Sequence, residues 1–77
     1  MITSKIKHIL EQVLDISTED FQKNIDIYSC EEWDSMSHMR LILELERIIL
    51  VNFSDEEVMD MTSYKNICDV VKKHKND

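Results

Sequence analysis

The most constraining feature of this 77-residue chain is that it contains neither glycine nor proline. Tight β-hairpin turns usually need glycine for positive φ, and the phosphate-binding loops of nucleotide enzymes are glycine-rich. The sequence therefore excludes a glycine-rich phosphate loop and disfavours a many-turned β-sandwich. Helices joined by non-glycine loops are the favoured fold, and the length fits a single domain over residues 1–77.

An apolar stripe at three- and four-residue steps predicts a first helix over residues 4–14, with Thr3 or Ser4 as its N-cap. A long polar connection follows, over residues 15–34. A connection of this length in so small a domain is often functional. Four apolar residues are scattered through it without a period, and we expect them to pin the loop over the core: Phe21, Ile25, Ile27 and Tyr28.

The second predicted helix, over residues 35–50, has two apolar faces when its residues are placed at about 100° per residue. One face is assigned to the core: Leu41, Ile42, Leu45, Ile48 and Ile49. The opposite face, here called the methionine face, carries Met36, Met39 and Leu43 beside Arg40 and Arg47. A domain this small has one core, so we expect the methionine face to lie near solvent. Exposed apolar surface usually marks a contact site, and methionine repacks against differently shaped partners.

Two shorter helices are predicted in the last third of the chain. Ser54 and Glu57 predict a capping box in front of a helix over residues 55–60. Thr62-Ser63 offers another N-cap, and an apolar stripe from Tyr64 predicts a final helix, whose closing cations suit the negative end of its dipole. Together these patterns predict an all-α, four-helix fold.

Acidic residues outnumber basic ones, 16 against 9, which gives a net charge of −7. Such a surface repels nucleic-acid backbones, so the sequence favours a partner protein with a basic patch. No apolar run approaches the roughly 18 residues of a membrane helix, and the first residues lack the pattern of a signal peptide. We expect a cytoplasmic monomer that does not insert into membranes.

No residue pattern predicts catalytic or metal-ligating residues. The three histidines lie on different predicted helices, and His38 is interpreted as a partly buried packing residue. Cys30 and Cys68 are interpreted as reduced thiols, the second in the core. Trp33 is interpreted as a lid over the core. The acidic run Asp55–Glu57 is explained by the preference of acids for a helix N-terminus.

Ser35 stands where the long connection meets the second predicted helix, in the order Trp33-Asp34-Ser35-Met36. Both Asp34 and Ser35 are suitable N-caps, so one of the two is spare. A phosphodiester on the serine hydroxyl would be stabilised there by the helix dipole and the free N–H groups.

Asp34-Ser35-Met36 resembles the Asp-Ser-Leu motif of acyl carrier proteins, and LILELERI, FSDEE and Thr62-Ser63-Tyr64 extend this resemblance without a gap over most of the chain. The resemblance implies a four-helix bundle with a short third helix. It also implies that Ser35, beside Asp34, receives 4′-phosphopantetheine from coenzyme A through a phosphopantetheinyl transferase. The thiol of that arm would carry an acyl or aminoacyl group as a thioester. The chain would then be a substrate of loading enzymes and acyltransferases with basic patches, and not itself an enzyme.

The chain departs from the fatty-acid-synthesis carriers, which usually have an acid after this triplet and a strongly acidic second helix. Here Ser37 follows, and Glu44 and Glu46 are balanced by Arg40 and Arg47. Tryptophan before the Asp-Ser pair resembles stand-alone carriers of specialised pathways. Two alternatives stay open: an aminoacyl carrier of the same fold, and an unmodified helical module that docks through the methionine face.

Overall fold

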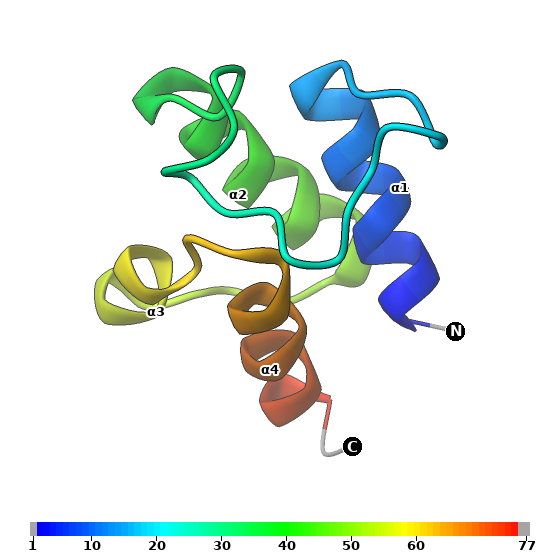
Figure 1. Cartoon of the computed structure of the whole chain (residues 1–77). Helices are drawn as coiled ribbons and strands as arrows, with labels where there is room; N and C mark the ends of the chain where they lie inside the picture. The colour runs from blue at the N-terminus through cyan, green and yellow to red at the C-terminus, as the bar shows by residue number, and fades with distance from the viewer. Residues whose placement is uncertain (1, 76–77) are drawn as a thin grey trace.

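The computed structural model describes residues 2–75 and confirms an all-α fold. Its four helices are α1 (Ile2–Leu14), α2 (Ser35–Ile49), α3 (Asp55–Asp60) and α4 (Tyr64–His74), as Figure 1 shows. Met1 and residues 76–77, which the one-domain prediction includes, lie outside the described residues. Within residues 2–75 the only extended pairing is an isolated antiparallel bridge between Asp26 and Ser63.

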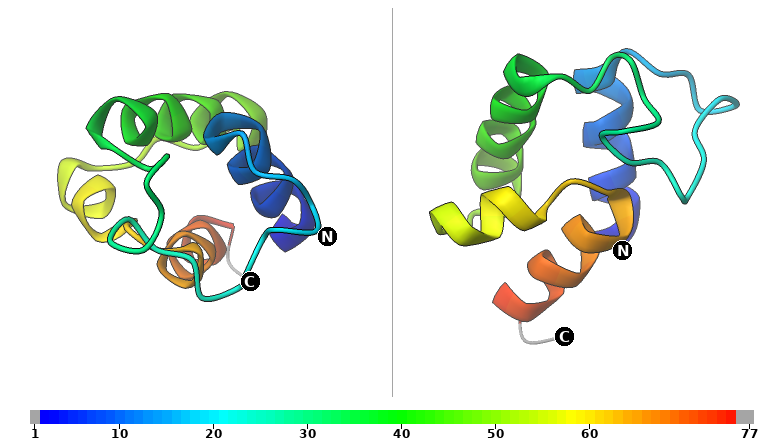
Figure 2. Two further views of the ribbon diagram at one scale, coloured as in Figure 1. Left: turned by 45° about the horizontal axis from the view of Figure 1, so that its top comes forward. Right: turned by 60° about the vertical axis from the view of Figure 1, so that its left-hand side comes forward.

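The helices pack around one apolar core. α1 packs against both α2 and α4, and α3 contacts α4. Figure 2 shows α1, α2 and α4 around the centre of the molecule, with the short α3 at one side. Burying one isoleucine or leucine side chain contributes about 1.5–3 kcal/mol, so the α1 and α2 stripes supply much of the stabilisation. The buried residues are Ile6, Ile9, Leu10, Leu14, Trp33, Leu41, Ile42, Leu45, Ile49, Met61, Ile67, Cys68 and Val71.

Two helix ends differ from the prediction. α1 begins at Ile2, so Thr3 and Ser4 lie inside the helix and do not cap it. α2 ends at Ile49, and Leu50 is its C-cap in the left-handed conformation, with φ 64° and ψ 53°. Glycine is the usual residue for that conformation, but this chain has none, and a leucine closes the helix instead.

The long connection between α1 and α2 crosses the bundle and is tied to the segment before α4 (Figure 1). The N–H of Ile27 donates to the carbonyl of Thr62 at 2.8 Å, and the N–H of Tyr64 donates to the carbonyl of Ile25 at 3.1 Å. Phe21, Ile25 and Ile27 pack against the core, as predicted. The connection is therefore held over the core by backbone hydrogen bonds as well as by apolar contacts.

Two apolar residues that were assigned to the core side are exposed instead. Tyr28 is 89% exposed, because Asp26 Oδ1 accepts the N–H groups of Tyr28 and Ser29 at 2.9 and 2.8 Å and turns the chain outward. Ile48 is 38% exposed, since it lies at the edge of the α2 stripe and Ile49 takes the buried position.

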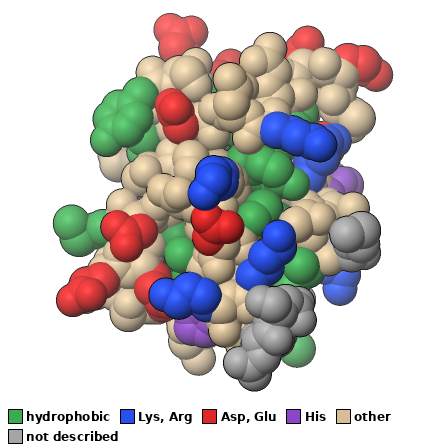
Figure 3. Space-filling model, turned by 60° about the horizontal axis from the view of Figure 1, so that its bottom comes forward, with side chains coloured by type: hydrophobic (Ala, Val, Ile, Leu, Met, Phe, Trp, Pro, Cys, Tyr) green, Lys and Arg blue, Asp and Glu red, His purple; other side chains and the backbone are tan. Residues whose placement is uncertain are grey.

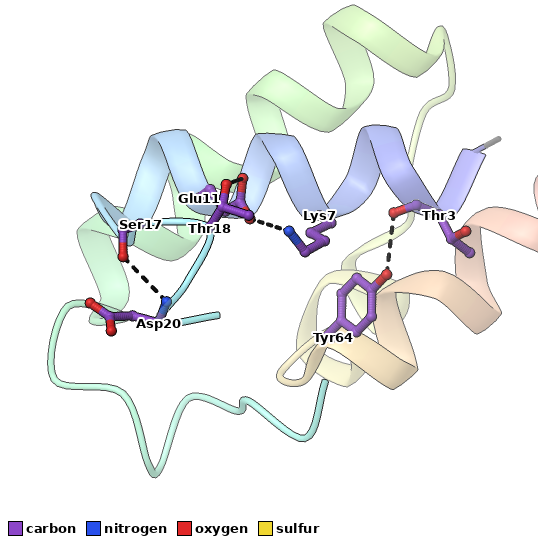
Figure 4. A network of polar contacts seen from close by, with 7 residues as sticks. All are labelled: Thr3, Lys7, Glu11, Ser17, Thr18, Asp20 and Tyr64. Carbon is purple, nitrogen blue, oxygen red and sulfur yellow. Dashed lines mark hydrogen bonds and ion pairs between the residues drawn. The ribbon is translucent and has the colours of Figure 1, made fainter. Parts of the chain in front are cut away.

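Polar contacts fasten the two ends of α1 to the rest of the chain (Figure 4). Glu11 pairs with Lys7 and accepts a hydrogen bond from Thr18 Oγ1 at 3.3 Å, which fixes the start of the long connection. The Tyr64 hydroxyl donates to the carbonyl of Thr3 at 3.2 Å, which joins α4 to α1. Burial raises the pKa of Tyr64 to about 12, so this hydroxyl keeps its proton near neutral pH.

Candidate functional site

Ser35 is the first residue of α2, and its side chain is exposed. Asp34 is the N-cap, since its Oδ1 accepts the N–H of Ser37 at 2.9 Å and its carbonyl accepts the N–H of His38 at 2.8 Å. Of the two suitable caps, Asp34 is therefore the one in use. The Ser35 hydroxyl makes no hydrogen bond to any other residue between 2 and 75, which leaves it free for reaction.

The hydrogen bond that makes Asp34 the N-cap also favours the negative charge of its carboxylate, beside Ser35. The backbone N–H of Ser37 stabilises the carboxylate and lowers the pKa of Asp34 below its ordinary value. Asp34 is therefore ionised at neutral pH, and it lies at the positive end of the α2 dipole. An exposed hydroxyl, an ionised carboxylate and a helix N-terminus thus lie within two consecutive residues.

Trp33 and His38 support this turn from inside. Trp33 is buried, as predicted for a lid, and its Nε1–H donates to His38 Nδ1 at 3.1 Å. His38 Nε2 lies 2.9 Å from the carbonyl oxygen of Val58 in α3. His38 is half-buried and both ring nitrogens have partners, so its interpretation as a packing residue is confirmed.

The methionine face of α2 lies in solvent, as the sequence predicted. Met36 is 78% exposed, Met39 54% and Leu43 60%, and Arg40 and Arg47 are exposed beside them. The opposite face of the helix buries Leu41, Ile42, Leu45 and Ile49. The face begins one residue after Ser35, so apolar side chains adjoin the free hydroxyl.

Neither cysteine has the environment of a nucleophile. Burial raises the pKa of Cys30. The Glu32 carboxylate, whose Oε1 lies 3.4 Å from the Cys30 Sγ, raises this pKa as well. Burial also raises the pKa of Cys68, which lies in the core as predicted. Both are free thiols, and neither is activated as a thiolate.

The acids at the start of α3 are explained by the structure of that helix. Ser54 Oγ accepts the N–H of Glu57 at 3.2 Å, and Glu57 Oε1 accepts the N–H of Ser54 at 2.8 Å, which confirms the capping box. The second oxygen of Glu57 lies 2.8 Å from His74 Nε2 on α4. Between residues 2 and 75, no group of three or more His, Cys, Asp or Glu side chains is placed to hold a metal ion. No helix in the same range is long and apolar enough to cross a membrane.

Comparison with known proteins bears on this site directly. Residues 4–71 match the family model described as "Phosphopantetheine attachment site". The chain belongs to this family. Two curated relatives, both named acyl carrier protein, are 23% identical (Coprothermobacter proteolyticus) and 29% identical (Buchnera aphidicola subsp. Baizongia pistaciae) over 73 residues. These alignments cover 95% of this chain and 89% and 94% of the relatives.

The cofactor of this phosphopantetheine-attachment family is covalently bound 4′-phosphopantetheine, as the resemblance implied. The described residues fit such a group. The attachment point needs a hydroxyl that is accessible and without an internal partner, and Ser35 has both properties. A phosphodiester there would lie at the N-terminus of a 15-residue helix, where the dipole favours negative charge.

Three contacts around this site were not predicted from the sequence. They are the Trp33–His38 hydrogen bond, the bidentate pair of Arg47 with Glu44, and the hydrogen bond from the Phe53 N–H to Glu46 Oε2. Only the Arg47–Glu44 pair had a sequence signal, because residues three apart on a helix are neighbours. The Trp33–His38 contact depends on how the chain enters α2, and the Phe53–Glu46 contact on how it turns back after α2.

Proposed function

We propose that Ser35 is the residue that bears 4′-phosphopantetheine. The observation that supports this most is the free, exposed hydroxyl at the first position of α2, where Asp34 performs the capping. A serine that capped the helix would have to give up a hydrogen bond when modified. Ser35 gives up none, so modification leaves the start of α2 intact.

In the proposed step, the Ser35 oxygen forms a bond to the pantetheine-side phosphorus of coenzyme A. The bond from that phosphorus to the bridging oxygen breaks, and adenosine 3′,5′-bisphosphate leaves. The hydroxyl proton passes to a base of the phosphopantetheinyl transferase. The N-terminus of α2 favours the phosphodiester charge that remains on the serine, and Asp34 keeps the first turn in place.

When bound, the group supplies a thiol that holds acyl groups as thioesters, and the chain supplies recognition and delivery. We propose that the protein shuttles acyl groups between biosynthetic enzymes and is not itself a catalyst. The two relatives named acyl carrier protein support acyl cargo. The two free thiols are typical of a reducing compartment, and we propose the cytoplasm.

The test is the intact mass before and after incubation with coenzyme A and a promiscuous phosphopantetheinyl transferase. We expect a gain of one phosphopantetheinyl group per chain, followed by a further gain when an acyl-loading enzyme and its acyl donor are added. An unchanged mass in the first step would instead support an unmodified interaction module. Loading by an aminoacyl-activating enzyme only would support an aminoacyl carrier.

A further inference from the structure

Both carboxylates of α2 are engaged within the protein. Glu44 accepts two hydrogen bonds from Arg47, at 3.2 Å from Nε and 2.8 Å from Nη2, and this pairing lowers the pKa of Glu44. Glu46 Oε2 accepts the backbone N–H of Phe53 at 3.0 Å. Between Ser35 and Ile49, therefore, each carboxylate has an internal partner for at least one of its oxygens.

Arg40, in contrast to these carboxylates, has no ion-pair partner among residues 2–75. It is exposed on the methionine face. It also borders a shallow hollow of about 280 Å³ between α1 and α2, lined by Gln12, Val13, Arg40, Leu43 and Glu44. His38, the other basic side chain of α2, is already hydrogen-bonded at both nitrogens. What α2 offers a partner is therefore one unpaired guanidinium among exposed methionine and leucine side chains.

We infer that Arg40 is a specificity contact at close range. The partner enzyme that it fits has an apolar docking surface with one carboxylate opposite the Arg40 guanidinium. This inference rests on the proposed carrier function. A guanidinium forms two parallel hydrogen bonds with a carboxylate, whereas it meets only repulsion from a lysine or arginine. Discrimination between enzymes then comes from both the attraction and the repulsion. The proposal rests on Arg40 and not on Arg47, because the Arg47 guanidinium is already paired with Glu44.

Long-range attraction is a separate effect. The chain carries −7 overall, so a basic enzyme surface is still attracted at a distance. Figure 3 shows a face on which basic side chains lie mostly in the middle and most acidic ones toward the left and upper edges, so the charges are unevenly distributed. Lys73, exposed on α4, provides a matched control, because Lys73→Gln changes the net charge as much as Arg40→Gln but on another helix.

The experiment measures the dissociation constant of the holo protein for a malonyl transferase of fatty-acid synthesis, by calorimetry at moderate salt. Two versions of the enzyme are used. The original has a basic residue in the surface on which the carrier docks, and the second version has glutamate in place of that basic residue. We expect wild type to bind the glutamate version at least about tenfold more tightly than the original, which is the lower end of the coupling between close charge pairs. Arg40→Gln should lose this gain, and Arg40→Lys should keep part of it.

Two controls separate Arg40 from general charge. Lys73→Gln, and the double variant Glu44→Gln with Arg47→Gln, should both keep the gain. The inference is overturned if wild type shows no gain, or if Arg40→Gln gains as much as Lys73→Gln. The intact mass of each sample, taken before titration, shows whether the chain carries a phosphopantetheinyl group, so failure of the carrier proposal and failure of the Arg40 inference are read separately.

Discussion

The indole N–H of Trp33 donates a hydrogen bond to Nδ1 of His38 across 3.1 Å, with the two rings stacked at 6.2 Å between centroids. Since Nδ1 accepts this bond, the proton of the neutral imidazole lies on Nε2, where it is donated to the carbonyl of Val58. Two hydrogen bonds thus connect the residue before the Asp34-Ser35 pair to α3. The first turn of α2 is held from inside by a contact between side chains five residues apart.

This connection predicts that Trp33 and His38 are energetically coupled. Trp33→Phe removes the donor, and leaves His38 Nδ1 without its partner, which costs about 1–3 kcal/mol. His38→Phe removes the acceptor and should cost a similar amount. Because each single change already breaks the shared bond, the double variant should lose less stability than the sum of the two. Urea unfolding of the four proteins measures this, and strictly additive losses would contradict the coupling.

The assignment of Asp34 as the cap of α2 predicts different effects for neighbouring substitutions. Asp34→Ala should cost about 1 kcal/mol of unfolding free energy, within the range of about 0.5–2 kcal/mol for lost N-caps. Ser35→Ala should change it by less than about 0.5 kcal/mol, as is usual for an exposed side chain without partners. Urea melts give both values. A larger loss for Ser35→Ala than for Asp34→Ala would show that the serine caps the helix.

The capping box at α3 predicts that Ser54→Ala costs about 0.5–2 kcal/mol, because the Glu57 N–H loses its acceptor. Phosphopantetheine transfer should change little, since Ser54 is outside the first turn of α2. Ser4→Ala is a suitable comparison, as this serine is exposed on α1 and its hydroxyl has no hydrogen-bond partner among residues 2–75. Coincident urea melts of Ser54→Ala and wild type would refute the capping role.

Ionisation of Glu57 is expected to account for part of the loss of folding stability at acidic pH. Its pKa lies below its ordinary value of 4.5, first because the Ser54 backbone N–H, and then His74, stabilise the carboxylate. The contribution of ionised Glu57 to the free energy of unfolding is therefore present at pH values above its ordinary pKa. It is lost as the pH falls through the lowered pKa of the folded state. Glu57→Gln should flatten the decline of stability below about pH 4.5. Denaturant melts between neutral pH and pH 3 test this, and an unchanged slope would exclude Glu57 as its source.

Local patterns were sufficient to predict the four helices and which of their faces are exposed. The spacing of Ile6, Leu10 and Leu45 predicted which helix faces are buried, and Ser54 with Glu57 predicted a cap that forms over three residues. The exposure of Met36 and Met39 followed from the presence of a second apolar face in a domain with one core. These features depend on residues close in sequence, where periodicity and capping preferences apply.

The choice of hydrogen-bond partners could not be predicted in the same way, even between residues close in sequence. Asp34 and Ser35 have nearly equal capping preference, so only the backbone geometry decides between them. The exposure of Tyr28 depends on a turn made by Asp26. A count of charges gave α2 two acids and two bases, but it did not reveal that three of these four side chains are occupied by internal partners.

The central claim is that Ser35 alone receives the phosphopantetheine arm, and the most direct test is intact mass with matched serine variants. Wild type, Ser35→Ala and Ser37→Ala are each incubated with coenzyme A and a promiscuous phosphopantetheinyl transferase. We predict one added phosphopantetheinyl group on wild type and on Ser37→Ala, and none on Ser35→Ala, with circular dichroism showing that all three remain helical. Transfer of the arm to folded Ser35→Ala, or its absence from wild type, would contradict the account.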